Sequence, residues 1–431
     1  MTVFDDLMSD HIVKESIYNI VDRLMIHQSS LNKVVSSSMQ SQVSYNKWLS
    51  LIGRLRGQSL FYPYLGSGFG RGAFVELADG SVKYDFISGI GVHWSHGDLD
   101  IVKACLNSAL MDTGMQGNLQ QHFGSVDLYK LFQSLSGLDH VFLTSSGVMA
   151  WENAVKIGFH FKKHATRLLA FEGAFCGRTV GAAHVTDKAA YRKGIPSTIA
   201  VDYLPFYNPN EGQEGIDRCC QLLRSYLNRY PDQYGCMVFE LIQGEGGFNV
   251  GSRRFFIALM SLLKQYDIPV YIDEIQTFGR VPQIFAFKMF QLEEYVDIVT
   301  VGKLSQVCAT LFTSKMNPEK GLLSQTFTSS TAAIEASKVI LSKLLSPQYS
   351  GKYGKISRIH GYFSRLLRAL FRRYSSDFKG PFGVGTMIAF EIFQGDMSLT
   401  MSFVHALFNN GVIAFVAGSE NDNYGVTTKF R

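Results

Sequence analysis

The sequence lacks the features that are typical of membrane proteins and of secreted proteins. Its six cysteines show no Cys-x-x-Cys spacing, which is typical of reduced thiols rather than of a disulfide framework or a zinc site. The first residues lack the basic start and apolar core of a signal peptide. No apolar run approaches the length of a membrane-spanning helix. We therefore expect a soluble cytoplasmic protein with no membrane partner and no bound metal.

A strong excess of charge of one sign is also missing. The 41 basic residues outnumber the 36 acidic ones, and the formal charge of +5 is too small and too dispersed to indicate nucleic-acid binding. Hydrophobic residues make up 46% of the chain and charged residues 18%, which is a globular composition and not a disordered one. A chain of 431 residues is long enough to form two packed domains.

The pattern of apolar residues changes along the chain. Helical spacing dominates up to about residue 56, and a glycine run from Gly66 then predicts a loop, either plain or open to a ligand. Two strand-like segments around an Asp-Gly turn follow and predict a hairpin. Strand and helix alternate from Val141 to Val301, which predicts a parallel sheet with right-handed crossovers.

The centre of this alternation is the segment Val270–Gln276, in which a buried strand leads into Asp273 and Glu274. The next strand-like run ends in Gly302-Lys303. A lysine and an aspartate at the ends of two neighbouring strands are what a pyridoxal-phosphate site needs: the lysine forms a Schiff base with the cofactor aldehyde, and the aspartate keeps the pyridine nitrogen protonated. Two other interpretations stay open, because Asp-Glu pairs also bind magnesium and Gly-Lys commonly follows strands.

Two further strand ends carry polar loops. The turn Ser146-Gly147-Val148 stands between a strand and a helix, where backbone N–H groups can hold an anion, although the same residues also serve as an ordinary helix cap. Phe175 and Arg178 follow the next strand and offer a ring face for stacking and a guanidinium for a carboxylate. Taken alone, these two residues are more typical of a core phenylalanine beside a surface arginine.

In this order, the loops resemble those of the class III (ω-amino-acid) aminotransferases of pyridoxal-phosphate fold type I, the family of the acetylornithine, ornithine and lysine ε-aminotransferases. The resemblance runs from about Gly66 to the end of the chain. It implies an α/β fold with a mostly parallel seven-stranded sheet in a large domain and a small α/β domain built from N- and C-terminal parts. The expected division is a helical arm and small-domain segment (1–95), a pyridoxal-phosphate domain (96–345) and a C-terminal small domain (346–431).

The resemblance also implies roles for residues around the cofactor. Lys303 matches the lysine that holds the cofactor as an aldimine and then moves protons, and Asp273 matches the partner of the pyridinium nitrogen. Ile275 matches the aliphatic residue beneath the ring, Gln276 the amide at the ring hydroxyl, and Phe175 the aromatic stacked on the ring. The phosphate is assigned to Ser146, Gly147 and Val148, with Thr326 reaching it from the neighbouring subunit of a homodimer.

Four residues are implied in substrate binding. Arg178 matches the arginine that binds a substrate carboxylate, and Tyr64 lies where relatives place aromatics at the pocket mouth. Glu245 resembles the gate glutamate of Gln-Gly-Glu-Gly, which pairs with an arginine near the C-terminus, here Arg431. Such a pair would let one pocket accept both an amine and a keto acid such as 2-oxoglutarate.

The sequence departs from the family pattern at several loops. Leu241 replaces a proline, Met149 replaces an acid of the phosphate loop, and the segment Asp273–Arg280 has lost a glycine. The segment Ser305–Cys308 replaces a Gly-Gly run and is similar to the Gln-Val-Cys of the lysine ε-aminotransferase branch. Relatives continue past the position of Arg431, so we expect the small domain to be cut short.

The sequence leaves three functions open. The first is an aminotransferase that moves a terminal (ω) amino group to a keto acid. The second is an aminomutase, decarboxylase or racemase on the same fold, and the third is a catalytically quiet dimeric binding protein. The altered loops favour the third, but Lys303, Asp273, Gln276 and Phe175 are all present, as are Arg178 and Thr326. We therefore expect an enzyme.

Overall fold

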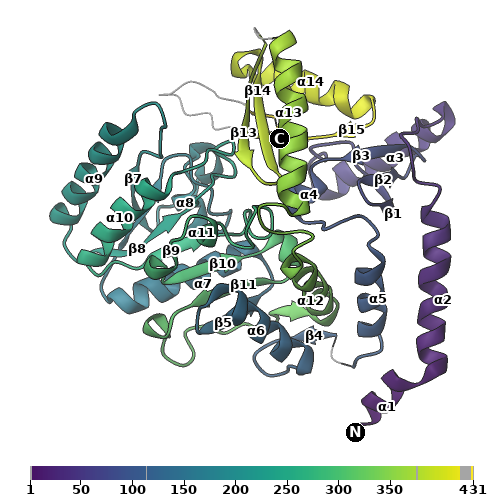
Figure 1. Cartoon of the computed structure of the whole chain (residues 1–431), viewed down its shortest axis with the longest axis horizontal. Helices are drawn as coiled ribbons and strands as arrows, with labels where there is room; N and C mark the ends of the chain where they lie inside the picture. The colour runs from purple at the N-terminus through teal and green to yellow at the C-terminus, as the bar shows by residue number, and fades with distance from the viewer. Residues whose placement is uncertain (1, 113, 375–376, 418–428, 431) are drawn as a thin grey trace. The chain divides into compact units, whose positions relative to one another are not determined.

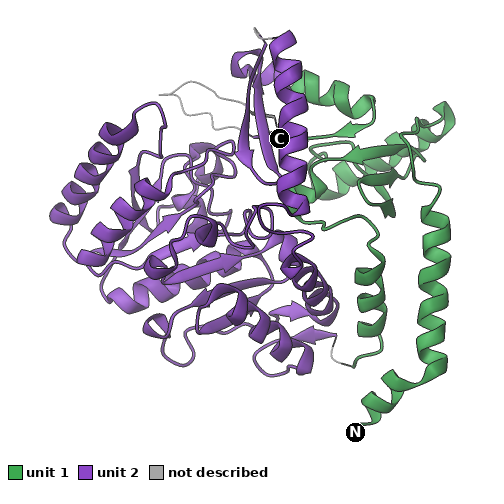
Figure 2. Cartoon of the chain, viewed as in Figure 1, with its two compact units in different colours: residues 1–112, 401–415 green, residues 113–400, 416–431 purple. Residues whose placement is uncertain are grey.

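The computed structural model describes residues 2–112, 114–374, 377–417 and 429–430 (Figure 1). The chain forms two compact units (Figure 2). The first unit joins residues 1–112 to residues 401–415, and the second joins residues 113–400 to residues 416–431. The division into three consecutive segments stays a prediction.

The first unit contains a four-stranded sheet in the order β1-β2-β3-β15, in which β15 runs parallel to β3 and the other pairs are antiparallel. The predicted hairpin is present as β2 and β3, but the glycine run expected as a loop forms strand β1. A side chain at Gly70 would place its Cβ 2.7 Å from the Cβ of His96, so glycine lets this strand pack closely. The strands are β1 (Gly66–Arg71), β2 (Phe74–Leu77), β3 (Val82–Asp85) and β15 (Val412–Ile413).

Helices make up most of the rest of this unit. Helix α2 begins where Asp10 accepts a hydrogen bond from the backbone N–H of Ile12 at 2.7 Å, an N-cap that satisfies part of the first turn. The helical arm predicted before residue 56 is therefore present as three helices. The helices are α1 (Val3–Ser9), α2 (His11–Gln28), α3 (Met39–Arg56), α4 (Ser88–Gly91) and α5 (Leu99–Ser108), with α14 (Met397–Asn409) ending in this unit.

The second unit is organised around a seven-stranded sheet in the order β5-β11-β10-β9-β8-β6-β7. The strands from β10 to β7 are parallel, as the alternation predicted, while β11 is antiparallel to both of its neighbours. Strand β11 was not predicted. The strands are β5 (His140–Thr144), β6 (Arg167–Phe171), β7 (Ala200–Leu204), β8 (Tyr234–Phe239), β9 (Val270–Asp273), β10 (Ile298–Val301) and β11 (Cys308–Phe312).

Helices pack on this sheet and close its core. Helix α7 contributes Trp151, Ala154 and Ile157, which are at most 1% exposed, to a core shared with strands of the sheet. Such burial of large apolar side chains is the main source of stability for a domain of this size. The helices are α6 (Phe123–Ser136), α7 (Gly147–Lys162), α8 (Val180–Val185), α9 (Gly212–Arg229), α10 (Arg253–Gln265), α11 (Ala286–Met289), α12 (Thr331–Leu345) and α13 (Lys355–Arg373).

Two smaller sheets complete the second unit. Strands β13 (Phe378–Val384), β14 (Met387–Ile392), β17 (Lys429–Phe430) and β16 (Val416–Ala417) form one of them in that order. Strand β4 (Met115–Gln116) pairs with β12 (Ser329–Ser330) and interrupts the region 98–137, which was predicted to be helical throughout. Of the helices in the described parts of the chain, none combines the length and apolarity that crossing a bilayer requires.

Candidate active site

The ends of β9 and β10 bring the predicted catalytic residues to one edge of the large sheet. The two strands are parallel and buried throughout, with Thr300 opposite Asp273 in the register. Asp273 is the last residue of β9, and Lys303 follows β10 by two positions. Because parallel strands end at the same edge, residues 30 positions apart in the sequence reach one place.

Asp273 is a buried carboxylate that the protein only partly stabilises. It is 8% exposed, and its Oδ1 accepts a hydrogen bond from the backbone N–H of Ile275 at 3.0 Å. Burial raises the pKa of Asp273 to about 6, while the Ile275 N–H, the charge of Lys303 and the hydroxyl of Thr300 oppose that rise. A cation added beside this carboxylate would therefore keep it ionised.

Glu240, just after β8, is a second buried carboxyl group at this edge. Its Oε1 accepts a hydrogen bond from the backbone N–H of Phe175 at 2.9 Å, and its Oε2 accepts one from that of Gly244 at 3.0 Å. Burial and the negative charge of Asp273 raise the pKa of Glu240 to about 8. At neutral pH Glu240 thus holds a proton and ties two loops together, a role that the sequence did not reveal.

Glu274 points into the protein instead of sharing a site with Asp273. Its Oε1 accepts a hydrogen bond from the backbone N–H of Phe287 at 2.8 Å, and its Oε2 accepts one from the hydroxyl of Thr277. Burial raises the pKa of Glu274 to about 7. Within the described residues, no group of three or more His, Cys, Asp or Glu side chains is arranged to hold a metal ion. Both carboxylate oxygens of Glu274 already bond to protein donors.

Glycines bring the phosphate loop against the ends of β9 and β10. Ser146 caps helix α7, because its Oγ accepts a hydrogen bond from the backbone N–H of Met149 at 3.3 Å. A Cβ added to Gly147 would lie 3.0 Å from two carbon atoms of Ile275, and one added to Gly302 would lie 3.1 Å from Cys308 Sγ. Side chains at either glycine would push these loops apart.

Lys303 begins a short 3-10 helix with unusual backbone geometry. Its φ is 51°, in the left-handed region that non-glycine residues rarely adopt and that often marks functional sites. Lys303 is half-buried, and its backbone N–H donates a hydrogen bond to the thiol of Cys308. Burial raises the pKa of the Cys308 thiol to about 11, so this thiol stays protonated.

Phe175 and Arg178 are joined by a residue that the sequence did not single out. The guanidinium of Arg178 lies 3.3 Å from the ring centroid of Tyr191, and that ring meets Phe175 edge-on with centroids 6.3 Å apart. Arg178 is exposed, and stacking on an aromatic ring orients it without neutralising its charge. Tyr191 lies in a short 3-10 helix (Ala189–Arg192), which has no strong periodic signal.

Two buried amides carry unsatisfied donors. The Nε2 atoms of Gln276 and Gln325 have no hydrogen-bond partner among the described residues. Gln325 Oε1 accepts a hydrogen bond from the hydroxyl of Thr144 at 2.7 Å, at the end of β5. The adjacent Thr326 is exposed. A buried donor without a partner is costly, so a ligand that accepts a hydrogen bond at Gln276 would relieve that cost.

The four other predicted site residues are Glu245, Val148, Tyr64 and Arg431. Glu245 is half-buried in the turn after β8, and Val148 packs on the backbone of Gly177. Tyr64 belongs to the first unit, where burial raises its pKa to about 12. Arg431 lies outside the described residues.

The chain matches the family model of the class-III aminotransferases over residues 68–423. It belongs to this family. The acetylornithine aminotransferase of Archaeoglobus fulgidus is 27% identical over 356 residues, which cover 80% of this chain and 85% of that protein. The acetylornithine aminotransferase of Oceanobacillus iheyensis is 31% identical over 241 residues, 54% of this chain and 56% of that protein.

Solved structures support the fold type. The lysine aminotransferase of M. tuberculosis superimposes with a TM-score of 0.77 at 19% identity, covering 89% of this chain and 93% of that one. The predicted fold, that of the type I pyridoxal-phosphate enzymes with a mostly parallel seven-stranded sheet, is confirmed. Class-III aminotransferases are enzymes that depend on pyridoxal 5'-phosphate and act on amino and keto acids.

The residues at the sheet edge fit this cofactor. Asp273 offers a buried carboxylate for a cationic ring nitrogen, and Gln276 has a buried N–H donor without a partner for a ring hydroxyl. The capped start of α7, with Gly147 against Ile275, leaves backbone N–H groups available to a phosphate. Each of these groups has a charge or a hydrogen-bonding capacity that the cofactor would satisfy.

Proposed function

We propose that this class-III aminotransferase moves a terminal (ω) amino group from an amine or amino acid to a keto acid such as 2-oxoglutarate. The observation that carries the proposal is the pairing of Asp273 and Lys303 at one sheet edge, where burial raises the pKa of Asp273 and the charge of Lys303 opposes that rise. The acetylornithine aminotransferases, which are similar to this chain, and a diaminobutyrate–2-oxoglutarate transaminase, 26% identical over 372 residues, support a donor with a terminal amino group.

When bound, pyridoxal phosphate supplies an aldehyde that carries the amino group and a ring that accepts electrons. Asp273 would hold a negative charge for the ring nitrogen, and its burial strengthens the electrostatic effect of that charge because little water screens it. Lys303 accepts and returns a proton at its Nζ, and its position at the strand end supplies proximity. Glu240 stays protonated, so Asp273 is the carboxylate that carries the charge.

Substrate recognition is assigned to the loops around this edge. Arg178 binds the carboxylate of the amino or keto acid, and stacking on Tyr191 keeps its fork oriented. Phe175 presents its ring to the cofactor, from a loop that the Glu240 bond fixes. Glu245 and Arg431 are proposed to exchange partners as the two substrates alternate, and Tyr64 to contact the substrate.

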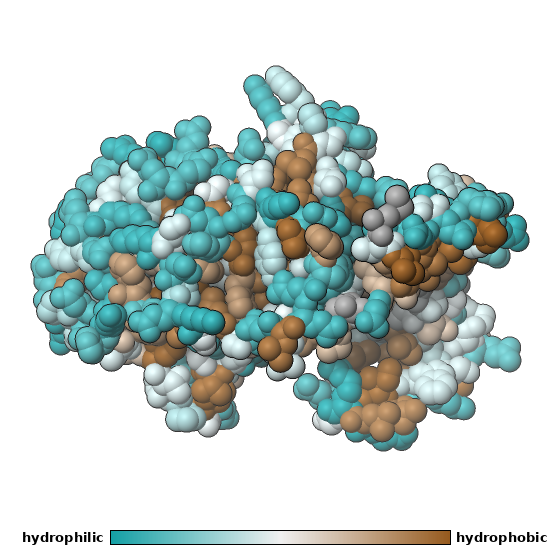
Figure 3. Space-filling view, turned by 90° about the horizontal axis from the view of Figure 1, so that it is seen from below, coloured by the Kyte–Doolittle hydropathy of each residue, from teal (hydrophilic) through white to brown (hydrophobic). Residues whose placement is uncertain are grey.

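We also propose a homodimer that shares its active sites and a cytoplasmic location. Thr326 is exposed, as a residue reaching a partner subunit must be in the isolated chain. Large apolar residues are exposed on α2, and Figure 3 shows apolar patches between hydrophilic side chains on the face that it draws. Patches of this kind commonly mark protein–protein contacts. The exposed residues of α2 are Ile12, Tyr18, Ile20, Met25 and Ile26.

The first test is the absorption spectrum of the purified protein with added pyridoxal phosphate, then borohydride reduction and peptide mass mapping. We expect a visible cofactor band and the reduced cofactor on Lys303, with both lost in Lys303→Ala. An amine-donor screen with 2-oxoglutarate follows, in which ω-amino donors should outperform α-amino acids that lack a second amine. Cofactor scattered over surface lysines, or no turnover of any ω-amino donor, would overturn the proposal.

A further inference from the structure

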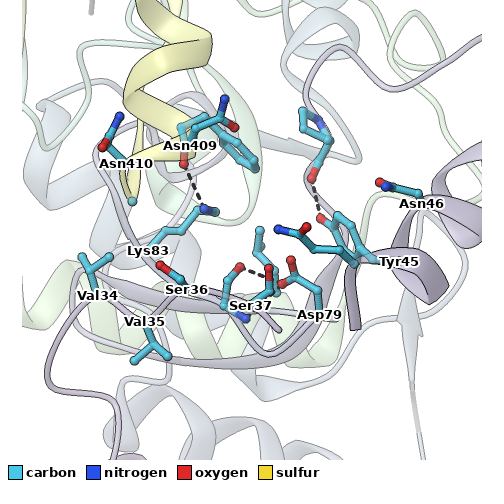
Figure 4. A pocket seen from close by; sticks show the side chains of 16 residues that line it. Val34, Val35, Ser36, Ser37, Tyr45, Asn46, Asp79, Lys83, Asn409 and Asn410 are labelled. Carbon is cyan, nitrogen blue, oxygen red and sulfur yellow. Dashed lines mark hydrogen bonds between the residues drawn. The ribbon is translucent and has the colours of Figure 1, made fainter. Parts of the chain in front are cut away.

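Lys83 is a buried lysine that the aminotransferase site does not use. It lies in β3 of the first unit and is only 8% exposed. Its Nζ donates a hydrogen bond to the carbonyl oxygen of Phe408 at 2.9 Å and lies 4.5 Å from the centroid of the Phe408 ring (Figure 4). In the described parts of the chain, no carboxylate lies within ion-pair distance of this ammonium group. A buried charge with only a carbonyl and a ring for partners is unusual, because burial without an ion pair is costly.

A cavity of about 520 Å³ opens beside Lys83. Its walls come from the segment before α3, from α3 itself, from the turn between β2 and β3, and from the end of α14, all within the first unit. The volume lies in the range of small-molecule sites. Polar side chains surround the opening, and several make no hydrogen bond with any described residue; these are Ser36, Ser37, Gln42, Asn46 and Asn409.

Asp79 supplies a negative charge on the same cavity. Its Oδ1 accepts hydrogen bonds from Ser81, from the backbone N–H at 2.9 Å and from the hydroxyl at 2.7 Å. Its Oδ2 accepts none from the residues that the structure describes. Asp79 and Lys83 influence each other electrostatically, because the charge of Asp79 opposes the lowering of the Lys83 pKa that burial causes. They are nevertheless too far apart to form an ion pair, so each has capacity for a ligand group of the opposite charge.

We propose that this cavity binds a free amino acid with a polar side chain. The ligand carboxylate pairs with Lys83 Nζ, and the ligand ammonium pairs with Asp79 Oδ2. The ligand side chain faces the hydroxyl and amide groups of the wall. A zwitterion fits because it brings one charge of each sign, whereas a simple anion would leave Asp79 unpaired and a simple amine would leave Lys83 unpaired. The site uses none of the residues assigned to amino transfer, so it goes beyond the proposed function.

The test is calorimetric titration of the full-length protein, saturated with pyridoxal phosphate, with three probes of related structure. L-glutamine carries both charges, 4-carbamoylbutanoate lacks the ammonium, and 4-aminobutanamide lacks the carboxylate. We expect glutamine to bind most tightly. Lys83→Met should weaken glutamine binding by about 30-fold or more, because one partner of a buried charge pair is lost. Asp79→Asn should remove the preference for glutamine over 4-carbamoylbutanoate.

Lys33→Met is the matched control, since Lys33 is exposed and does not line the cavity. It should bind glutamine like the unchanged protein. Thermal melting checks that each variant folds. If Lys83→Met does not fold, Asp79→Asn still tests the proposed site. Glutamine binding that neither cavity variant changes comes from elsewhere, for example the amino-transfer site, and overturns the proposal. Equal binding of glutamine and 4-carbamoylbutanoate, or no binding at all, overturns it as well.

Discussion

The ends of β8 and β9 carry two buried carboxyl groups whose chemistry differs. Glu240 accepts a hydrogen bond from a backbone N–H on each oxygen, yet its pKa is raised to about 8 by burial and by the charge of Asp273. Asp273 accepts one bond from the backbone, and its pKa is raised only to about 6. Two carboxylates in one buried place cannot both ionise cheaply, so one takes the proton.

The two acids therefore have different roles: Glu240 is a neutral structural group, and Asp273 carries a negative charge. Glu240 holds the Phe175 loop to the turn after β8, and a neutral acid can do that. Asp273 keeps the negative charge that we propose faces the cofactor's ring nitrogen. The assignment can be tested in three ways: by substituting each acid, by measuring how the stability of the protein depends on pH, and by crowding the loop next to the end of β9.

The largest effect is expected from Asp273→Asn. The amide keeps the shape of the side chain and removes the charge, so we expect the rate of amino transfer to fall by roughly 10³-fold, within the range of acid–base contributions. Steady-state kinetics with the best ω-amino donor measures this. The matched variant Glu240→Gln is neutral like the protonated acid, although it gives up one of the two backbone hydrogen bonds, and it should change the rate by less than about tenfold. Equal losses in the two variants would contradict the assignment.

The second prediction concerns the free energy of unfolding as a function of pH. The pKa of Glu240 is raised from 4.5 to about 8 in the folded protein. Between these values the native state holds a proton that the unfolded state has released. Stability should therefore fall as the pH rises, by about 1.4 kcal/mol per pH unit for one extra bound proton. Glu274 contributes in the same direction up to about pH 7.

Urea unfolding of the cofactor-free protein from pH 5 to pH 8.5 measures this dependence. Glu240→Gln should reduce the loss of unfolding free energy with rising pH. The reduction should be clearest above pH 7, where Glu274 has already lost its proton. The control is Glu294→Gln, which changes an exposed glutamate and should leave the slope as it is. A Glu240→Gln slope equal to that of the unchanged protein would show that Glu240 is ionised throughout.

The contrast between Asp273 and Glu240 was only half visible in the sequence. An apolar run before an acid predicts a strand end, and parallel strands align their ends, so Asp273 and Lys303 could be paired from the pattern alone. The role of Glu240 depends on a backbone N–H 65 positions away, at Phe175, which no local pattern encodes. Tyr191 was missed for the same reason, because its contact with Arg178 depends on how a loop and a 3-10 helix fold back.

The errors in the fold have a similar cause. The glycine run at β1 has the composition of a loop, but it pairs with β2 and packs closely on His96 at Gly70, which composition does not reveal. Strand β11 is a short apolar run, Cys308–Phe312, which periodicity cannot distinguish from a buried turn or helix. Lys83 is buried although it is charged, because the end of α14, more than 300 residues later, covers it.

The smallest predicted effect separates crowding from charge at the end of β9. Gly147→Ala places a Cβ 3.0 Å from Ile275 without changing any ionisable group, so the phosphate loop must shift. We expect the affinity for pyridoxal phosphate to fall by about tenfold, a cost typical of mild overpacking, while the rate at saturating cofactor changes little. Fluorescence titration and kinetics measure the two quantities. Gly361→Ala is the control, since its Cβ meets nothing within 4 Å in helix α13 and should leave affinity unchanged. A loss of rate in Gly147→Ala as large as that in Asp273→Asn would mean that packing, and not the charge of Asp273, sets the activity of this edge.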